Sequence, residues 1–249
     1  MNKWKRAIVV GASSGIGEEL ARKLVASGVS TALVARREAE LKNLAESLNG
    51  GRETGLARAY PHDVTKYDEA PGLFAQIASD LGGVDLVIYS AGAMPKIGDD
   101  EYNTEKDALI YNVNVIGAAA WLNLAAQRFS QQKSGTIVGI SSVAGDRGRR
   151  GQPAYCASKA AMDTYMEALR NRLSTRGVSV VTIKPGPVKT PLTAGLGKLP
   201  MMIDADVAAD QILAAAGTGV NVAYVPAKWR LVMTIIRAIP SPIFRYLKI

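Results

Sequence analysis

The sequence has few of the residues that disulfide, metal and triad chemistry require. Its 249 residues include one cysteine, Cys156, and one histidine, His62. A single cysteine excludes an internal disulfide and is compatible with a reducing compartment. A single histidine argues against a histidine-rich metal site and against a Ser-His-Asp triad, and the remaining metal-ligating residue types do not cluster along the chain. We therefore expect no metal, and we expect other groups to carry the chemistry.

The sequence also lacks a long apolar run at its N-terminus. The run at 7–10 is too short for a signal peptide and has no cleavage site, so we expect a cytoplasmic protein. The net charge is +8, but most basic residues are dispersed and no zinc-finger, helix-turn-helix or RNA-binding signature is present. This pattern predicts no nucleic-acid partner. Anionic small ligands or a membrane surface account for the charge at least as well.

What the sequence does contain is a regular alternation of apolar strand-like runs and amphipathic helical segments. The predicted strands are 5–10, 31–35, 55–60, 84–90, 135–141, 178–184 and 220–225. The clearest predicted helices are 16–27, 38–48, 67–80 and 154–176. Such alternation predicts a parallel sheet with helices on both faces, which is a doubly wound α/β fold. No linker, repeat or low-complexity tract divides the chain, so we expect one domain over 1–249.

A glycine-rich turn follows the first predicted strand and precedes a helix. Gly11, Gly15 and Gly17 bracket the segment that contains Ser13, Ser14 and Ile16. Glycines let the backbone turn sharply and approach a pyrophosphate, which the N-terminus of the following helix attracts. A glycine-rich turn alone is not specific, and the alternative is a tight turn without a ligand. The strand before it and the helix after it favour a dinucleotide site.

The end of the second predicted strand bears on the choice of cofactor. NAD-specific folds place an acid there to hold the ribose 2′-hydroxyl, whereas this chain has Ala35 followed by Arg36 and Arg37. A guanidinium pairs well with a 2′-phosphate, so the sequence favours NADP(H) over NAD(H). The alternative is that both arginines belong to a solvated first helical turn.

Three polar side chains are predicted to converge at the carboxyl edge of the sheet. Tyr155 and Lys159 are four residues apart on a predicted helix and therefore share a face. Ser142 follows an apolar strand, at the edge where open α/β sheets bind ligands. Together they could polarise a carbonyl and protonate the alkoxide, and we expect the lysine charge to lower the tyrosine pKa. The alternative is an exposed tyrosine and lysine on an ordinary helix.

Other polar positions have less certain roles from sequence alone. Asp63 could orient an adenine or cap the next helix, and His62 is expected on a surface loop. Asn112 and Asn114 lie inside an otherwise apolar helical segment. A buried amide is costly unless it is hydrogen-bonded, so we expect one of them to make a specific contact.

The motifs from 5 to 190 resemble the classical short-chain dehydrogenase/reductase family. The glycine turn resembles its cofactor turn, Asp63-Val64 its adenine contact, and Ala91-Gly92 part of its Asn-Asn-Ala-Gly element. By the same resemblance, the catalytic tetrad comprises Asn114, Ser142, Tyr155 and Lys159, and the nicotinamide-side segment includes Pro185, Gly186, Val188 and Thr190. Val10 and Tyr89-Ser90 depart from the family pattern, which puts local geometry rather than chemistry in question.

The resemblance implies a Rossmann-type sheet of seven strands and an assembly of two or four copies. It also implies hydride transfer from NADPH to a carbonyl carbon. Tyr155 would be the proton donor, Ser142 would bind the same oxygen, Lys159 would hold the nicotinamide ribose, and Asn114 would position a water. An alternative is a non-catalytic module that binds NADP and serves regulation or membrane attachment. The complete tetrad favours the enzyme, because a binding module needs none of these residues.

Two segments bear on the substrate. By position, 187–204 resembles the family's substrate lid, and its Leu192 and Leu196 favour a hydrophobic or lipid-linked carbonyl substrate, although they could merely pack on the core. The segment 146–150, hereafter the arginine loop, contains Arg147, Arg149 and Arg150. These could receive a phosphate or carboxylate of the substrate, or they could be solvated.

The C-terminal tail, 226–249, is basic and has no acidic residue. Its basic residues are Lys228, Arg230, Arg237, Arg245 and Lys248. Its predicted helix has an apolar face formed by Trp229, Val232, Met233 and Ile236 and widened by Leu231 and Ile235. Such a helix can lie on an anionic membrane surface, close the substrate pocket or pack against another subunit. The tail and the arginine loop resemble a bacterial subgroup that includes the reductase component of decaprenylphosphoryl-ribose 2-epimerase.

Overall fold

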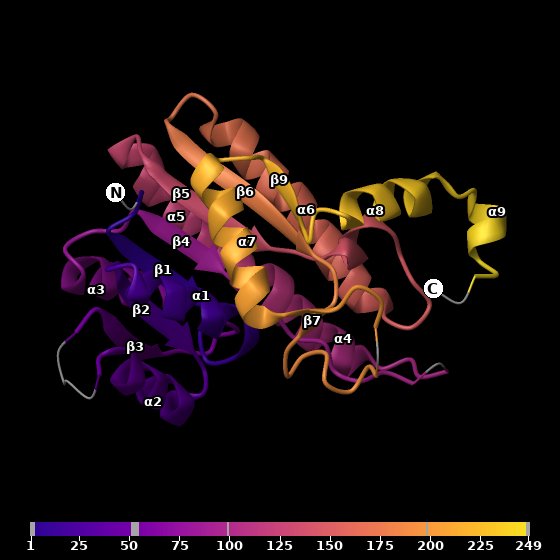
Figure 1. Cartoon of the computed structure of the whole chain (residues 1–249), viewed down its shortest axis with the longest axis horizontal. Coiled ribbons are helices and arrows are strands. Elements are labelled where there is room, and N and C mark those ends of the chain that lie inside the picture. The colour runs from indigo at the N-terminus through magenta and orange to yellow at the C-terminus, as the bar shows by residue number, and fades with distance from the viewer. Residues whose placement is uncertain (1–2, 51–54, 99, 198, 248–249) are drawn as a thin grey trace.

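The computed structural model describes residues 3–50, 55–98, 100–197 and 199–247. Its centre is a parallel sheet of seven strands in the order β3-β2-β1-β4-β5-β6-β9 (Figure 1). The strands are β1 (Arg6–Val10), β2 (Ser30–Ala35), β3 (Ala57–Pro61), β4 (Leu86–Tyr89), β5 (Gly135–Ile140), β6 (Val178–Pro185) and β9 (Val222–Val225). The strand order reverses between β1 and β4, and ligands bind at such a reversal in open α/β sheets.

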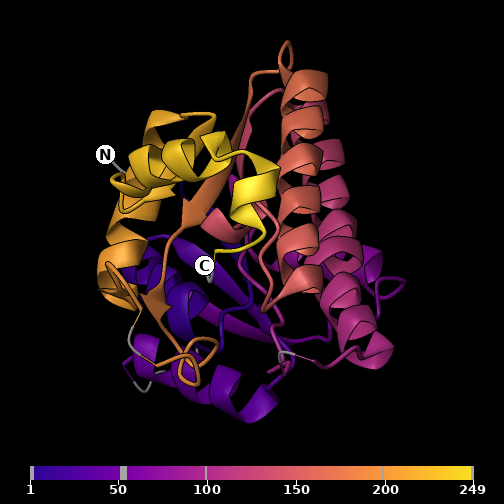
Figure 2. The same ribbon diagram turned by 90° about the vertical axis from the view of Figure 1, so that its right-hand side faces the viewer.

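Helices cover both faces of this sheet, and the two views in Figures 1 and 2 show the resulting three layers. One face carries α1 (Gly15–Ala26), α2 (Glu38–Leu48) and α7 (Ala205–Thr218). The other carries α3 (Ala70–Asp80), α5 (Ala118–Gln132) and α6 (Pro153–Leu173), with α4 (Thr104–Tyr111) and the π-helical turn η1 (Asn112–Gly117) leading into α5. The fold class expected from the sequence is therefore confirmed.

The core is divided by the sheet into two apolar clusters. Leu20, Leu41 and Ile212 pack on one face, and Trp121, Phe129 and Met166 pack on the other. Because both faces are covered, the strands are apolar at nearly every position rather than at alternate ones. This continuous burial explains why all seven strands were predicted within two residues of their observed bounds.

The helical run 104–132 is long and apolar enough to cross a membrane by length and composition alone. The core helix of a globular protein passes the same test. Here Trp121 and Leu122 are fully buried against the sheet, whereas Leu109, Tyr111 and Ile116 are exposed on the outer side.

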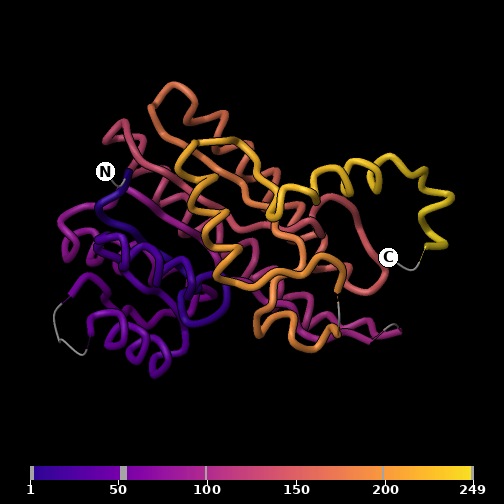
Figure 3. Tube along the Cα trace, in the orientation of Figure 1, coloured from indigo at the N-terminus to yellow at the C-terminus, as the bar shows by residue number. Residues whose placement is uncertain are grey.

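Two regions after β6 contain elements that the strand and helix patterns did not predict. The lid segment includes a short parallel pair formed by β7 (Val188–Lys189) and β8 (Ile203–Asp204). The tail forms α8 (Trp229–Ala238), the amphipathic helix expected there, and then the short α9 (Ser241–Phe244), which was not predicted. Both extend beyond the main body in Figures 1 and 3. Lys248, one of the tail's basic residues, lies outside the described residues.

Candidate active site

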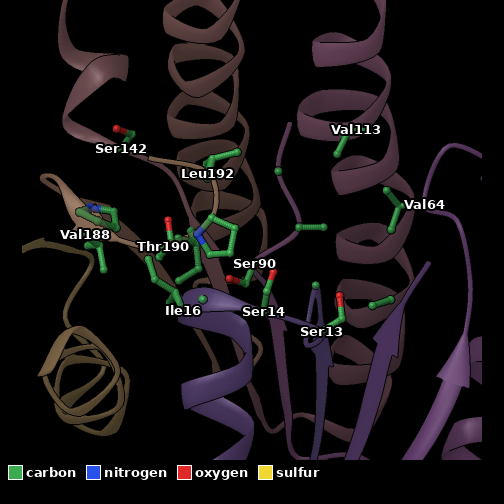
Figure 4. A pocket seen from close by; sticks show the side chains of 18 of the residues that line it. Ser13, Ser14, Ile16, Val64, Ser90, Val113, Ser142, Val188, Thr190 and Leu192 are labelled. Carbon is green, nitrogen blue, oxygen red and sulfur yellow. The ribbon is translucent and has the colours of Figure 1, made fainter. Parts of the chain in front are cut away.

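A cavity of about 510 Å³ lies at the carboxyl ends of the parallel strands. It is lined by every predicted cofactor residue except Gly17, and by Ser142, Tyr155 and Lys159. Leu192 also lines it, as Figure 4 shows, whereas Asn114, Leu196 and the three arginines of the arginine loop do not. The structure thus brings together residues that lie as far apart in the sequence as Gly11 and Leu192.

The glycine turn joins β1 to α1, and its glycine positions leave no room for a side chain. Gly11 has a φ of +93°, and its N–H donates to the Val34 carbonyl at 2.7 Å. A Cβ at Gly11 would overlap the Ala91 backbone, and one at Gly17 would overlap the Gly11 carbonyl. By contrast, a Cβ at Gly92 would make only ordinary contacts, 3.7 Å from Asn114 Oδ1 and 3.9 Å from Lys159 Nζ. The turn and Gly92 therefore form a backbone-lined cradle in which a phosphorylated ligand can lie close to the main chain.

The two arginines after β2 have different environments. Arg37 Nη2 donates to Ser13 Oγ at 2.9 Å and to Ser14 Oγ at 2.6 Å, so its guanidinium lies against the glycine turn. The Arg36 side chain is 70% exposed, and its Nη1 lies 3.7 Å from Asp63 Oδ2. Both line the cavity, and Arg37 is the one held directly at the glycine turn.

Asp63 does not cap the next helix, α3, whose N-cap residue is Glu69, and its other expected role, orienting an adenine, stays a prediction. Its Oδ1 accepts hydrogen bonds from the Thr65 N–H at 3.0 Å and the Thr65 hydroxyl at 2.8 Å, so the side chain caps the local turn. The residue also lines the cavity. Partial burial raises the pKa of its carboxyl, but the Thr65 hydrogen bonds and the Arg36 charge outweigh this and the net pKa is lowered. Asp63 is therefore ionised at neutral pH.

The expectation of a surface-loop histidine is wrong. His62 is buried, and its ring packs edge-on against Trp121 with 5.6 Å between ring centroids. Burial lowers the pKa of His62. Trp121 comes from α5, far along the chain, so local sequence did not reveal this contact.

Asn114 fixes the loop after β4 from within the π-helical turn η1. Its Oδ1 accepts from the Ala93 N–H at 2.7 Å, and its Nδ2 donates to the Ala93 carbonyl at 3.1 Å and to Ser158 Oγ at 3.0 Å. The amide is fully buried and hydrogen-bonded at both ends, as expected for one of the two asparagines. π-helical turns of this kind are often found at functional sites.

Tyr89 accounts for one of the departures from the family pattern. Its hydroxyl is buried and donates to the Val113 carbonyl at 2.6 Å, which ties the end of β4 to η1. This bond holds the helical turn η1 against the end of β4.

Ser142, Tyr155 and Lys159 meet at one wall of the cavity. Pro153 begins α6, which places Tyr155 in the first turn and Lys159 in the second. Lys159 Nζ donates to the Ile140 carbonyl at 2.9 Å and lies 5.7 Å from the Tyr155 ring centroid. Ser142 caps the short helix η2 (Val143–Asp146), with its Oγ accepting from the Ala144 N–H at 3.1 Å.

The expected lowering of the Tyr155 pKa is wrong for the protein alone. Burial raises the pKa of Tyr155 to about 12, and the Ser142 hydroxyl and the Arg149 charge only partly oppose it. Burial also lowers the pKa of Lys159 to about 8, against the charge of Asp163. Burial disfavours the charged phenolate of Tyr155 and the charged ammonium of Lys159, and this cost exceeds the attraction between the two charges. Tyr155 is therefore a protonated phenol at neutral pH.

A buried ionic cluster behind this wall was missed by sequence reasoning. Lys184 of β6 contacts Asp146 and Asp163, with a distance of 2.9 Å from its Nζ to Asp163 Oδ2. The Tyr224 hydroxyl donates to Asp146 Oδ2 at 2.8 Å. Asp163 is one helical turn after Lys159, and that spacing was the only local signal available. In the part of the chain that the structure describes, no group of three His, Cys, Asp or Glu residues is arranged to hold a metal ion.

The arginine loop contacts the tail mainly through Arg147 and Arg149, which are partly buried, whereas Arg150 is exposed. Arg147 Nη1 donates to the carbonyls of Ile236 and Ile239, each at 2.6 Å, and its guanidinium lies 3.8 Å from the centroid of the Phe244 ring. Arg150 makes a longer contact of 3.4 Å to the Arg245 carbonyl. The sequence suggested two roles for this loop, a receptor for a substrate anion and a solvated loop. Neither included its contact with the tail.

Arg149 differs from its two neighbours. Its Nη2 lies 3.9 Å from Met233 Sδ, and its buried Nε has no hydrogen-bond partner among the described residues. Its positive charge lowers the pKa of Tyr155, so it lies within electrostatic reach of the tyrosine hydroxyl.

Trp229 brings the tail to the cofactor side of the cavity. A Cβ on Gly186 would overlap its indole ring, so the glycine allows the tail to pack closely. Trp229, Met233 and Val143 form a small apolar cluster that fixes α8 on η2. The tail thus packs behind the cavity wall at Gly186, but none of its described residues lines the cavity, and whether it closes the substrate pocket stays a prediction.

Comparisons with known proteins agree with this architecture. A family model described as short chain dehydrogenase matches residues 5–199. An uncharacterised oxidoreductase of Myxococcus xanthus is 34% identical over 244 residues, which cover 97% of this chain and 95% of the relative.

Solved structures show the same similarity. A short-chain type dehydrogenase/reductase from Mycobacterium ulcerans superposes with a TM-score of 0.81 at 26% identity, covering 98% of each chain. A variant of actinorhodin polyketide ketoreductase with NADPH has a TM-score of 0.79 at 23% identity, covering 89% of this chain and 95% of that one, and shows the shared fold. The chain belongs to the short-chain dehydrogenase/reductase family of oxidoreductases.

Proposed function

We propose that the protein is an NADPH-dependent reductase of a hydrophobic or lipid-linked ketone. The observation that carries the proposal is one cavity with the glycine turn and Arg37 at one side and Ser142, Tyr155 and Lys159 at another. The cradle formed by the glycine turn and Gly92 fits a dinucleotide. When bound, NADPH would supply a hydride to the substrate carbonyl carbon and leave as NADP⁺.

The preference for NADP(H) is supported by the position of Arg37. Its guanidinium is held on Ser13 and Ser14, where it would meet a 2′-phosphate, and Ala35 provides no carboxylate to bind a 2′-hydroxyl. Arg36 would add positive charge from the outer side. Charge-assisted hydrogen bonds to phosphate are stronger than neutral ones, which favours NADPH over NADH.

Proton transfer would start from the Tyr155 phenol. Because burial keeps this phenol protonated, it can donate to the oxygen that becomes negative as hydride arrives, and the product is an alcohol. The Ser142 hydroxyl would donate to the same oxygen, and this bond strengthens as charge develops. The charged Lys159 would stabilise the phenolate that remains and would hold the nicotinamide ribose.

Asn114 would act at the proton-return step. Its side chain is fully occupied by Ala93 and Ser158, so its direct effect is to hold η1 and the loop after β4 in place. We propose that the water that resupplies the proton is positioned by this held segment.

Two features support a hydrophobic or lipid-linked substrate, an apolar side chain at the cavity and an arginine close to Tyr155. Leu192 lines the cavity and gives an apolar wall, while Leu196 lies farther along the lid segment and is exposed. Arg149 is the arginine whose charge lowers the pKa of Tyr155, and it could receive a phosphate or carboxylate of the substrate. An apolar group and an anionic group on one substrate are features of a lipid-linked ketosugar. Arg147 and Arg150, engaged with the tail, would contribute only indirectly.

We further propose a homodimer or homotetramer. The exposed apolar side chains Leu109, Tyr111 and Ile116 on the outer side of α4 and η1 support it. The family commonly forms such assemblies.

A direct test is turnover by the Tyr155→Phe variant. NADPH absorbance would be followed over sterols, quinones, acyl thioesters and ketosugars to find a substrate. With that substrate, loss of the general acid should reduce kcat by on the order of a hundred- to ten-thousandfold while NADPH still binds. Near wild-type turnover by the variant would refute the assignment. NADPH binding without turnover on any ketone would instead favour a non-catalytic regulatory module.

A further inference from the structure

The outer face of α8 carries exposed apolar side chains. Leu231 is 68% exposed and Ile235 is 58% exposed, one turn apart on the helix. The sequence pattern predicts one apolar face that includes both residues. In the structure, however, the face that packs on the body of the protein is formed by the buried Trp229 and Met233. Ile243 and Tyr246 continue the exposed apolar surface beyond α8. We call Leu231, Ile235, Ile243 and Tyr246 the outer apolar set.

Basic side chains flank this set. On the helical wheel of α8, Lys228 lies beside Ile235 on one edge, and Arg230 and Arg237 lie on the opposite edge. Arg245 follows beside Tyr246, with its guanidinium 4.9 Å from the centroid of the Tyr246 ring. No aspartate or glutamate occurs anywhere in 226–249. An apolar centre with cationic edges is the arrangement by which a surface helix lies in the headgroup region of a bilayer.

The outer face is also held rigidly in one orientation. Arg147 binds the last carbonyls of α8 and lies over Phe244 of α9, so both helices are fixed to the loop between Ser142 and Tyr155. Figure 2 shows α8 and α9 lying across the side of the molecule that faces the viewer, with their outer surface away from the sheet. A surface that is already ordered loses little entropy when it binds.

We propose that the outer face of α8 and α9 docks on a bilayer that contains anionic lipids. Two other occupants fit the observations less well. A second copy of the same face would bring like charges together, which is unfavourable. A nucleic acid would use the cationic edges but would leave the outer apolar set without a partner. Because the arginine loop holds the tail, docking would also bring the active-site wall close to the lipid surface.

The test is cosedimentation of the full chain with vesicles. Vesicles of phosphatidylcholine alone would be compared with vesicles that also contain phosphatidylglycerol. We expect binding to the mixed vesicles and at least about tenfold weaker binding to the neutral ones, since each basic residue near the surface contributes. High salt should release the protein from the mixed vesicles.

Two double variants separate the contributions. The first replaces apolar residues and is Leu231→Glu with Ile235→Glu. The second replaces basic residues and is Lys228→Glu with Arg230→Glu. Each should weaken binding to the mixed vesicles by at least about tenfold. The matched control for the first is Val207→Glu with Val220→Glu, two exposed apolar residues outside the tail. The matched control for the second is Lys42→Glu with Lys66→Glu, which makes the same charge change elsewhere. The controls should bind as the wild type does. Circular dichroism would confirm that every variant is folded.

Three outcomes would overturn the proposal. In the first, the wild type fails to sediment with anionic vesicles. In the second, the tail variants bind the vesicles as well as the wild type does. In the third, light scattering shows that the tail variants lose self-association while their vesicle binding is unchanged. The last would assign the face to a second copy of the chain. Vesicle binding is measured without cofactor or substrate, so it succeeds or fails independently of the reductase activity.

Discussion

Tyr155 and Lys159 lie on consecutive turns of α6, and burial changes their pKa values in opposite directions. It raises that of Tyr155 to about 12 and lowers that of Lys159 to about 8. The first effect keeps a proton donor available at neutral pH and suits reduction of a ketone. The second places loss of the lysine charge just above neutral pH, so the lysine environment should determine the alkaline limit of the reaction.

Asp163 should set this alkaline limit. Its charge raises the pKa of Lys159, in opposition to burial. Reduction should therefore fall as pH rises through about 8, and in Asp163→Asn the fall should occur at a lower pH. The measurement is kcat against pH for wild type and variant.

A conservative replacement distinguishes charge from packing. Asp163→Glu keeps the carboxylate and should restore most of the wild-type profile, although the contact with Lys184 will shift. An unchanged profile in a folded Asp163→Asn protein would show that Asp163 does not control the charge of Lys159.

At the scale of elements, the tail and the arginine loop form one unit. Arg147 donates to the carbonyls of Ile236, near the end of α8, and of Ile239, just after it, and a cation is favourable at that end of the helix dipole. The apolar cluster of Trp229, Met233 and Val143 fixes the other end. The loop that precedes Tyr155 and the last helix therefore depend on each other for their positions.

Arg147→Ala should loosen the tail without unfolding the sheet. Loss of charge-assisted hydrogen bonds and of the contact with Phe244 should cost about 2 kcal/mol locally, which is roughly a thirtyfold increase in amide exchange. Hydrogen exchange followed by mass spectrometry would measure this in 229–247. Arg150→Ala removes only the 3.4 Å contact and should have a much smaller effect. Similar exchange in both variants would contradict the role assigned to Arg147.

At the scale of the whole molecule, the cavity joins parts of the chain that lie far apart in the sequence. It is lined by residues of β2, β5, β6, α1 and α6, by the segments that follow β1, β3 and β4, and by the lid segment. A ligand that binds only the folded state stabilises it by mass action, so cofactor preference should be visible in global stability.

NADPH should raise the melting temperature more than NADH does at equal concentration. A hundredfold excess over Kd adds about 2.7 kcal/mol, and each kcal/mol corresponds to roughly 2–4 °C for a chain of this size. Differential scanning fluorimetry would measure the shift. Arg37→Ala should lose most of the NADPH advantage and Arg36→Ala less, because only Arg37 is held on Ser13 and Ser14. Equal shifts for the two cofactors in the wild type would argue against NADP specificity.

The sequence alone determined the parts of this protein that depend on short-range periodicity. The seven strands follow from apolar runs that must be buried on both faces. The glycine turn follows from steric limits within a few residues, and the Tyr155-Lys159 pair follows from the helical repeat. These features need no knowledge of distant neighbours, and together they were enough to predict the fold, the glycine turn and the Tyr155-Lys159 wall of the cavity. The resemblance to a known family, rather than any local pattern, supplied Ala91, Gly92 and the segment 185–190.

Tertiary structure decided what depends on residues far apart in the chain. Trp121 buries His62, the carbonyls of Ile236 and Ile239 engage Arg147, and the body of the protein covers only one side of α8 and leaves Leu231 outside. The pKa values of Tyr155 and Lys159 follow the same logic, because desolvation is the sum of everything packed around a group. Burial and electrostatics are collective properties of the folded chain, and no local pattern encodes them.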